Sequence, residues 1–268
     1  MVLLPSHFFP PHNRNRMARE GDVLRARGEF IAGGSRNLRA LLRQRYEWMN
    51  EFIDAQDIVV ELGCGAGLTP FFVRNGTLFV TDVHSYPWAA ATVNALCLPF
   101  RPASVDAFIC VNVIHHLAAP VSFLDSVRFC LKPGGYILVH EPNPSVLMLA
   151  ALRLMNHEGW SLDVDIFDPE SIANDPSDPW SGNNAISRLL FSDPRFASRF
   201  PDLRIVRDRF TECLMFPLSG GVTAKTWSLE LPDSVLKVIA RIDNVLCSIA
   251  PSALAMGRSM ALQKELQS

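Results

Sequence analysis

The sequence predicts an α/β protein with a doubly wound, mostly parallel β-sheet that is covered by helices on both faces. Between residues 57 and 141, apolar runs of strand length alternate with helical patterns. Such alternation favours a parallel sheet, because each parallel connection needs a crossover segment. The chain has 268 residues, of which 49% are hydrophobic and 19% charged, and this composition agrees with a large buried core rather than with a disordered chain.

The first part of the chain predicts an arm followed by helices. Residues 1–16 are expected to form a flexible arm, because Pro, Asn and Arg stand where periodic apolar residues would be needed. The arm has no basic region before an apolar one and does not resemble a signal peptide. Residues 17–268 are expected to form a single domain. Residues 17–55 have apolar side chains at helical spacing and predict two helices that Gly33-Gly34 separates.

Residues 57–141 are expected to form the core that binds a ligand. Strands are predicted at Ile58–Leu62, Leu78–Asp82, Asp106–Val113 and Tyr136–Glu141, and helices at Leu68–Arg74 and Val121–Leu131. Glu61, Asp82 and the pair His115-His116 lie at or just beyond strand ends. Ligands of doubly wound sheets bind outside these carboxyl ends, which makes these residues candidates for a site.

The alternation breaks after Glu141. Residues 142–202 contain one helical pattern, Pro144–Met155, and are otherwise rich in Asp, Pro, Asn and Trp, so an inserted substrate lid is expected there. Residues 203–268 predict strands at Leu203–Arg209 and Met256–Gln263 around a helix at Val235–Cys247. The apolar face of that helix favours core packing, with contact to a membrane or a lipid-linked substrate as the alternative.

Charge and cysteine content exclude several classes of protein. The net charge of −2 gives no basic footprint, so nucleic acid is not favoured as a partner. The six cysteines contain no Cys-x-x-Cys pair, which disfavours a zinc site, and no metal is expected. Most of them lie in apolar runs and are expected to be buried, reduced thiols of a cytoplasmic protein. No uncharged run resembles a transmembrane helix.

The most specific motif follows the first predicted strand and is Glu61-Leu62-Gly63-Cys64-Gly65-Ala66-Gly67. Glycines at such a turn allow positive φ angles and close approach of a ligand to the backbone. A dinucleotide-binding fingerprint has its third glycine three residues after the second, and that position is Leu68 here. Glycines at every second residue behind a strand-end acid instead resemble motif I of the class I S-adenosylmethionine (SAM) dependent methyltransferases.

Three more segments resemble this family, in the expected order. Asp82 follows Gly63 by 19 residues at the next strand end. Leu98-Pro99-Phe100 with Ser104-Val105-Asp106 resembles the segment before the fourth strand, and Leu131-Lys132-Pro133-Gly134-Gly135 resembles the turn before the fifth. The resemblance implies a Rossmann-like sheet of seven strands, a methyltransferase of type 11, SAM as cofactor and S-adenosylhomocysteine as product.

The resemblance also assigns cofactor contacts to particular residues. Glu61 and Gly63 are expected to hold the methionine ammonium, and Asp82 with its neighbour Val83 the ribose. Asn94-Ala95 stands where an Asp often contacts adenine, so this bond would be accepted by an uncharged amide carbonyl. The full set of expected cofactor residues is Glu61, Gly63, Cys64, Gly65, Gly67, Asp82, Val83, Asn94, Ala95 and Asn112.

Candidate catalytic residues lie after the fourth strand and in the insertion. Adjacent residues of a strand point to opposite sides, so only one of His115 and His116 is expected to face the site, and His116 is chosen. His157 and Glu158 are candidate general bases on a substrate hydroxyl, with a hydrogen bond within the lid as the alternative. Trp160 and Trp180 are expected to be packing anchors, as loop tryptophans more often are, with stacking on a sugar as the alternative.

Segments of the insertion and of residues 218–221 resemble a branch of methyltransferases that accompanies glycosyltransferases in glycan and polysaccharide pathways. The resemblance implies O-methylation of a hydroxyl on a sugar, a glycan precursor or another small molecule, with carbohydrate and lipid-linked acceptors among the candidates. C- or N-methylation of a quinone or natural product is the first alternative, and a non-catalytic regulatory or partner module with a SAM fold is the second. Peripheral membrane contact, oligomeric state and acceptor atom stay open.

Overall fold

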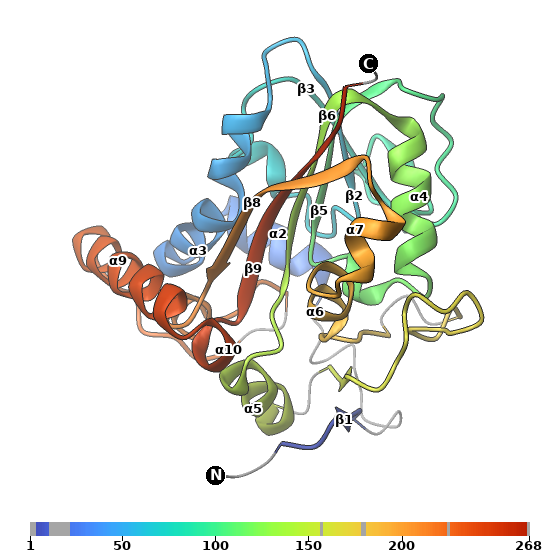
Figure 1. The fold of residues 1–268 in the computed structure, drawn as a ribbon. Helices are drawn as coiled ribbons and strands as arrows, with labels where there is room; N and C mark the ends of the chain where they lie inside the picture. Colours follow the sequence, from blue (N-terminus) through green and yellow to red (C-terminus); the bar gives the residue numbers. More distant parts are fainter. Residues whose placement is uncertain (1–3, 11–21, 156–157, 178–180, 224–225, 267–268) are drawn as a thin grey trace.

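The structure, a computed structural model, describes residues 4–10, 22–155, 158–177, 181–223 and 226–266. A seven-stranded sheet has the order β4-β3-β2-β5-β6-β9-β8 (Figure 1). Its strands are β2 (Ile58–Leu62), β3 (Thr77–Asp82), β4 (Ala91–Thr92), β5 (Val105–Val111), β6 (Leu131–Pro142), β8 (Leu203–Thr211) and β9 (Gly257–Lys264). All neighbouring pairs from β4 to β6 are parallel, and β9 is antiparallel to both of its neighbours. The predicted mostly parallel α/β sheet of seven strands is confirmed.

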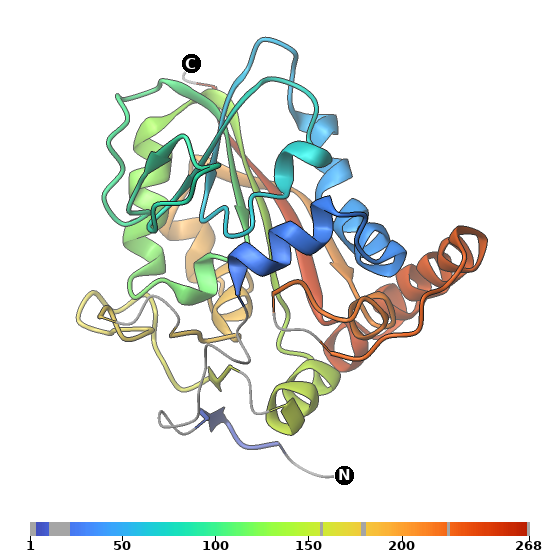
Figure 2. The same ribbon diagram turned by 180° about the vertical axis from the view of Figure 1, so that it is seen from behind.

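Helices cover both faces of the sheet (Figures 1 and 2). One group comprises α2 (Val23–Ile31), α3 (Arg36–Tyr46) and the 3-10 helix η1 (Glu47–Phe52), and the other comprises α4 (Pro120–Cys130), α6 (Ile186–Phe191) and α7 (Arg195–Arg199). Successive strand residues point to opposite faces. Phe108 and Cys110 of β5 therefore join the core cluster under α4, whereas Ala107 and Ile109 join the cluster under α3.

The helix after residue 232 is longer than predicted and extends from Asp233 to Ile249 (α9). On one side Leu236 packs in a cluster with Leu41 and Met215, which confirms core packing for this face. Ile242 and Val245 on the other side are exposed. None of the helices in the described ranges combines the length and the apolarity that a bilayer span needs.

The predicted helix Leu68–Arg74 is wrong, because the structure has only the 3-10 turn η2 (Thr69–Phe71) there. The amide of Asn50 ends the turn: its Nδ2 donates to the Phe72 carbonyl at 2.9 Å, and its Oδ1 accepts from Arg74 N at 2.8 Å. These bonds use backbone groups that a continuing helix would need. Residues 83–104 are all described and contain turns and β4 but no helix. The connection between β3 and β5 is therefore made without a helix.

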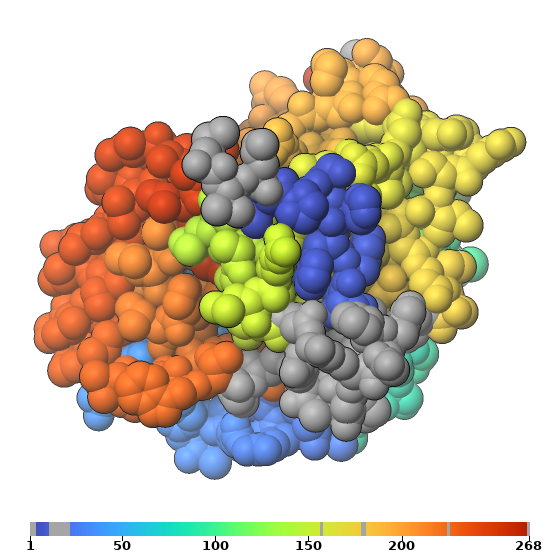
Figure 3. Space-filling view, turned by 90° about the horizontal axis from the view of Figure 1, so that it is seen from below, coloured from blue at the N-terminus to red at the C-terminus, as the bar shows by residue number. Residues whose placement is uncertain are grey.

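Residues 142–202 begin at the last residue of β6. Their described part contains α5 (Val146–Met155), β7 (Trp160–Ser161), α6 and α7. The N-terminal strand β1 (His7–Phe8) pairs antiparallel with β7. Figure 3 shows α5 and residues 4–10 side by side on one face of the molecule. Leu4 and Phe8 pack against the cluster that contains Trp160 and residues of α5, which joins the first described residues to the insertion.

Candidate active site

Two cavities meet at the carboxyl ends of β2, β3, β5 and β6. The smaller one has a volume of about 250 Å³ and the larger one about 400 Å³. Four residues line both cavities, namely Gly63, Gly65, Asn112 and His116. A ligand that fills the smaller cavity would therefore present one end to the contents of the larger cavity.

The glycine turn shapes the junction of the cavities. Gly63 has a φ of +71°, and a Cβ atom there would lie 2.5 Å from Cγ2 of Val113. Gly65 has a φ of +45°, and a Cβ atom there would meet nothing within 4 Å. Glycine is thus required at 63 by conformation and close packing, whereas at 65 the backbone borders open space.

Asp82 stabilises this turn and also lines the smaller cavity. Its Oδ2 accepts from Gly65 N at 2.8 Å, and its Oδ1 accepts from His84 N at 2.9 Å. Because a carboxylate can accept about four hydrogen bonds, the side chain retains capacity for a ligand. Val83, Asn94 and Ala95 line the same cavity. The smaller cavity thus brings together seven of the ten predicted cofactor residues, namely Gly63, Gly65, Asp82, Val83, Asn94, Ala95 and Asn112. Cys64 lines only the larger cavity, and Gly67 is not among the described residues that line either cavity.

Glu61 lies in the protein interior, with an exposed fraction of 1%, and is not among the described residues that line either cavity. The Thr69 hydroxyl donates to its Oε1. Its Oε2 has no hydrogen-bond partner among the described residues. Burial, with a further contribution from the charge of Asp82, raises the pKa of Glu61 to about 8. A cationic group near this carboxylate would stabilise its ionised form.

His115 and His116 both line the larger cavity, so the prediction that only one faces the site is wrong. The two residues belong to a 3-10 turn, η3 (Ile114–His116), and not to an extended strand, and their ring centroids lie 4.0 Å apart. The alternation of side chains that governs strands does not apply in such a turn.

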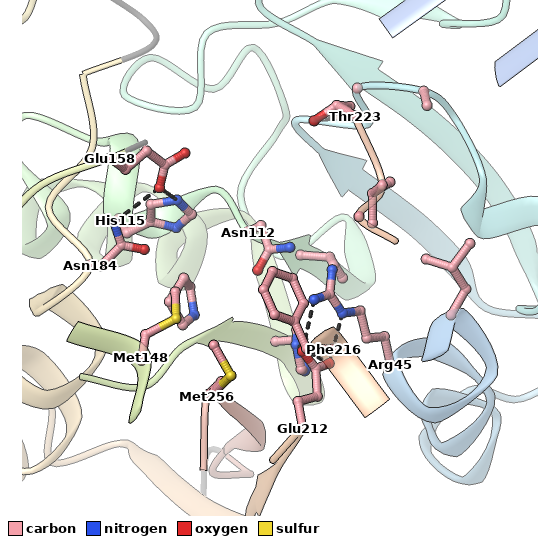
Figure 4. Close-up of a pocket in the computed structure, with 18 of the residues that line it drawn as sticks. Arg45, Asn112, His115, Met148, Glu158, Asn184, Glu212, Phe216, Thr223 and Met256 are labelled. Atoms are coloured by element: carbon pink, nitrogen blue, oxygen red, sulfur yellow. Dashed lines mark hydrogen bonds and ion pairs between the residues drawn. The ribbon is translucent and has the colours of Figure 1, made fainter. Parts of the chain in front are cut away.

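The carboxylate of Glu158, in the wall of the same cavity, lies close to both imidazoles. Its Oε2 lies 3.5 Å from Nε2 of His115, and its Oε1 lies 3.9 Å from Nε2 of His116. Asn184 holds the carboxylate from the other side by donating Nδ2 to Oε2 at 3.0 Å. Figure 4 shows Glu158, His115 and Asn184 gathered at one end of the cavity.

Glu141, at the end of β6, fixes the η3 turn. Its carboxylate accepts from the backbone N of Val113 and of Ile114, both at 2.7 Å, and lies 2.6 Å from Nδ1 of His115. Burial lowers the pKa of His115, but the carboxylates of Glu141 and Glu158 outweigh burial and raise this pKa to about 10. For His116, burial and the adjacent charge of His115 both lower the pKa.

A buried ionic network forms another part of the same cavity. Arg45 donates Nε and an Nη to the two oxygens of Glu212 at 2.7 and 2.8 Å. His140 lies 2.9 Å from Glu212 through Nε2 and 2.9 Å from the Ser259 hydroxyl through Nδ1. Although burial opposes ionisation, Arg45 and His140 hold the pKa of Glu212 far below its usual range. Glu212 is therefore an anion, and its carboxylate is already paired with Arg45 and His140.

A large part of the remaining wall of the larger cavity is apolar, although Thr223 and Thr226 also line it. It is contributed mainly by α5, by α8 (Met215–Leu218) and by the residue before β9. The side chains are Met148, Ala151, Leu152, Met155, Phe216 and Met256. Methionine is flexible and polarisable and adapts to irregular apolar ligands.

Several residues of the site were not predicted from the sequence. The main ones are Glu141, Asn184 and the pair of Arg45 and Glu212, whereas His115 was a candidate over which His116 was chosen. Glu141 had a detectable signal, since it is an acid at a strand end like Glu61 and Asp82. The others come together only through the tertiary structure.

Two predicted residues lie outside the described ranges, namely His157 and Trp180. Trp160 is fully buried, packs on Phe8 at 5.0 Å between ring centroids and donates Nε1 to the Pro5 carbonyl at 3.1 Å. It is therefore a packing anchor, as favoured from the sequence, and its burial rules out the alternative that it stacks on a sugar.

Residues 60–139 match a family model described as a methyltransferase domain. A ubiquinone biosynthesis O-methyltransferase of Cupriavidus pinatubonensis is 30% identical over 102 residues, which are 32% of this chain and 41% of that protein. Its counterpart from Paraburkholderia phymatum is 28% identical over 106 residues, 33% of this chain and 45% of that protein. The chain thus spans less than half the length of these two relatives.

Among solved structures, a SAM-dependent methyltransferase from Archaeoglobus fulgidus has the same fold. Its TM-score is 0.51 at 16% identity, over 88% of this chain and 98% of that one. The residues present fit SAM: the open space beside Gly65, the carboxylate of Asp82 and the unpartnered buried oxygen of Glu61 suit a nucleoside with a cationic amino-acid end. Residues 60–139 are therefore similar to a methyltransferase domain, and the sheet has the fold of a SAM-dependent methyltransferase.

Proposed function

We propose that this protein is an enzyme that transfers the methyl group of SAM to a hydroxyl oxygen of a small molecule with an apolar body. The single observation that carries the proposal is the junction of the cavities, where Gly63, Gly65, Asn112 and His116 line both. A cofactor in the smaller cavity and an acceptor in the larger one would meet there.

In this proposal the cofactor contacts follow the resemblance. Asp82 accepts hydrogen bonds from the ribose, with Val83 beside it, and Asn94-Ala95 borders the adenine. Gly63, Cys64, Gly65 and Gly67 surround the methionine part, and Asn112 borders the sulfonium. Glu61 stabilises the methionine ammonium, directly or through water, which its unpartnered buried Oε2 supports.

SAM supplies an electrophilic methyl group, so the protein has to position the acceptor and exclude water. Fixing two reactants in a reactive geometry can lower a barrier by about 7–11 kcal/mol. The apolar wall of α5 and α8 would hold the body of the acceptor, and the part of the cavity with His116 and Glu158 would receive its hydroxyl. A carboxylate or imidazole that takes the proton contributes roughly 10²–10⁴-fold.

An oxygen acceptor is favoured over carbon or nitrogen for two reasons. The cluster of His116, Glu158 and Asn184 supplies hydrogen-bonding partners that a hydroxyl needs. Two similar proteins are named as ubiquinone biosynthesis O-methyltransferases. Methionine, leucine and phenylalanine side chains suit a phenol or another largely apolar alcohol better than a bare sugar. A lipid-linked or aglycone-bearing sugar is the form in which the predicted glycan acceptor would fit this wall.

We further propose a cytoplasmic location, which the reduced state of the cysteines supports. All six are free thiols and five of them are buried. Disulfides persist mainly in oxidising compartments, so a chain of free buried thiols suits a reducing one.

The proposal is tested by a panel of phenolic, quinol, sugar and lipid-linked acceptors, with release of S-adenosylhomocysteine as the measurement. The position of the methyl group in the product is then determined by mass spectrometry and NMR. A methyl ether is expected from an acceptor with an apolar body. Methylated carbon or nitrogen, or a product formed only from simple sugars, would contradict the proposal.

A further inference from the structure

Three metal-ligating side chains converge in the larger cavity near its junction with the smaller one, although no metal is expected from the sequence. His115, His116 and Glu158 each offer an atom, and these atoms all lie within 4.8 Å of one another. All three residues line the cavity. They come from η3 and from the segment before β7, so the cluster is formed by the fold and not by a local motif.

Both imidazoles are held so that Nε2 faces Glu158. Nδ1 of His115 lies 2.6 Å from the Glu141 carboxylate, and Nδ1 of His116 lies 3.0 Å from the Ser181 carbonyl. A carbonyl and a carboxylate only accept, so each Nδ1 donates and each Nε2 is directed at the cluster. Histidines that bind metal ions in proteins are commonly fixed in this way, by a carboxylate or a backbone carbonyl on the other ring nitrogen.

We propose that Nε2 of His115, Nε2 of His116 and a carboxylate oxygen of Glu158 bind one divalent transition-metal ion of the Zn²⁺ class. Two imidazoles and one carboxylate suit zinc, manganese or iron, whereas calcium and magnesium prefer oxygen ligands alone. The carboxylates of Glu141 and Glu158 supply negative charge beside the ion.

The spacing of the ligand atoms fits such an ion. Zinc bonds to nitrogen and oxygen are about 2.0–2.2 Å long, so two ligands at a tetrahedral angle lie roughly 3.4 Å apart. The observed separations are 3.5 Å from Oε2 of Glu158 to Nε2 of His115 and 3.9 Å from Oε1 of Glu158 to Nε2 of His116, and one ligand atom from each residue lies within 4.8 Å of the others. A small rotation of the side chains closes the difference, and the ion replaces the proton between His115 and Glu158.

Three protein ligands leave a coordination position open, as in catalytic metal sites and unlike closed structural ones. This position would face the larger cavity, where the acceptor hydroxyl would bind; with the ion in place, the ion would lower the pKa of that hydroxyl instead of His116 or Glu158 taking its proton, and the proton would pass to water. Only that last step depends on the proposed function. Binding of the ion itself does not, and it is measured without SAM or acceptor.

The test uses the full-length protein after treatment with a chelator. Cobalt(II) is titrated with visible absorption as the measurement, and zinc(II) is titrated by calorimetry. We expect saturation at one equivalent, with cobalt d–d bands and without a thiolate charge-transfer band, because the site contains no cysteine. Glu158→Gln and His116→Gln should each weaken binding by at least about tenfold. Far-UV circular dichroism and the unfolding midpoint verify that each variant is folded.

The matched control is His7→Gln, which removes an exposed histidine that lies 3.3 Å from Asp163 and outside both cavities. It should leave the affinity unchanged. The proposal is overturned if the wild-type protein shows no saturable binding, if a thiolate band appears, or if His7→Gln weakens binding as much as the two ligand variants do. Folded ligand variants with wild-type affinity would overturn it as well.

Discussion

The two cavities meet at the same strand ends but are built in different ways. The smaller cavity is lined mainly by strand ends and the turns that follow them within residues 63–118, and from outside this range by Asp175 and Pro176. The larger cavity takes its polar side chains from distant parts of the chain, with Arg45, His115, Glu158, Asn184 and Glu212 all contributing. A site built from turns can be predicted from the spacing of residues in the sequence. A site built from side chains that are distant in the sequence can be identified only from the structure.

The comparison implies that the two cavities can be impaired separately, and the largest effect is expected at Glu158. Glu158→Gln keeps the shape and the contact with Asn184 but removes the charge. Turnover should fall by roughly 10²–10⁴-fold, the usual contribution of a proton-accepting group. The affinity for S-adenosylhomocysteine should not change, since Glu158 does not line the smaller cavity. Steady-state kinetics and calorimetry check the two parts, and an equal loss in both would show that the cavities are not separable.

The converse change is Asp82→Ala in the smaller cavity. It removes a carboxylate that we expect to accept two hydrogen bonds from the ribose. At about 1.5 kcal/mol each, their loss weakens cofactor binding by roughly 100-fold. Calorimetric titration with S-adenosylhomocysteine measures the effect. Asp202→Asn, on a carboxylate that pairs with Arg128 outside both cavities, serves as the control. Unchanged affinity in Asp82→Ala would remove the proposed cofactor assignment.

A smaller effect is expected from the apolar wall. Met155 ends α5, lines the larger cavity and is exposed, so Met155→Ala should disturb the fold little. The loss of two buried methylene equivalents, at about 0.8 kcal/mol each, should raise KM for the acceptor by roughly tenfold. The value of kcat and the affinity for the cofactor should stay the same. If KM is unaffected, the acceptor does not lie against α5.

The smallest effect concerns the pH dependence of stability through Glu61. Its pKa is raised to about 8 from 4.5, so in this window the folded state holds a proton that the unfolded state has lost. Its contribution to the free energy of unfolding therefore falls as pH rises, by at most about 1.4 kcal/mol per pH unit. Urea unfolding between pH 5 and 9 should show this decline relative to Glu61→Gln. Parallel curves for the two proteins would mean that Glu61 is ionised throughout.

Sequence spacing predicts those parts of the fold whose geometry depends on residues close together in the chain. The glycines after Glu61 and the strand-end acid Asp82 predicted the sheet and the cofactor, because both depend on the geometry of single turns. The prediction of a helix at Leu68–Arg74 was wrong because Asn50, a residue from another element, forms hydrogen bonds with the backbone of Phe72 and Arg74.

The predictions for the residues around the acceptor were incomplete for a related reason. The prediction for His115 and His116 assumed an extended strand, but Glu141 accepts from the backbone after β5 and turns it into η3. Arg45 and Glu212 are 167 residues apart, and no pattern along the chain connects them. Contacts of this kind depend on the whole fold.

The measurement that tests the central claim most directly is product analysis with the acceptor panel, run in parallel on the wild-type protein, Asp82→Ala and Glu158→Gln. We predict that the wild-type protein releases S-adenosylhomocysteine together with an equal amount of a methyl ether. Asp82→Ala should lose this activity through cofactor affinity, and Glu158→Gln should lose it through turnover. Methyl transfer to carbon or nitrogen, or cofactor binding without any transfer across the panel, would contradict the account.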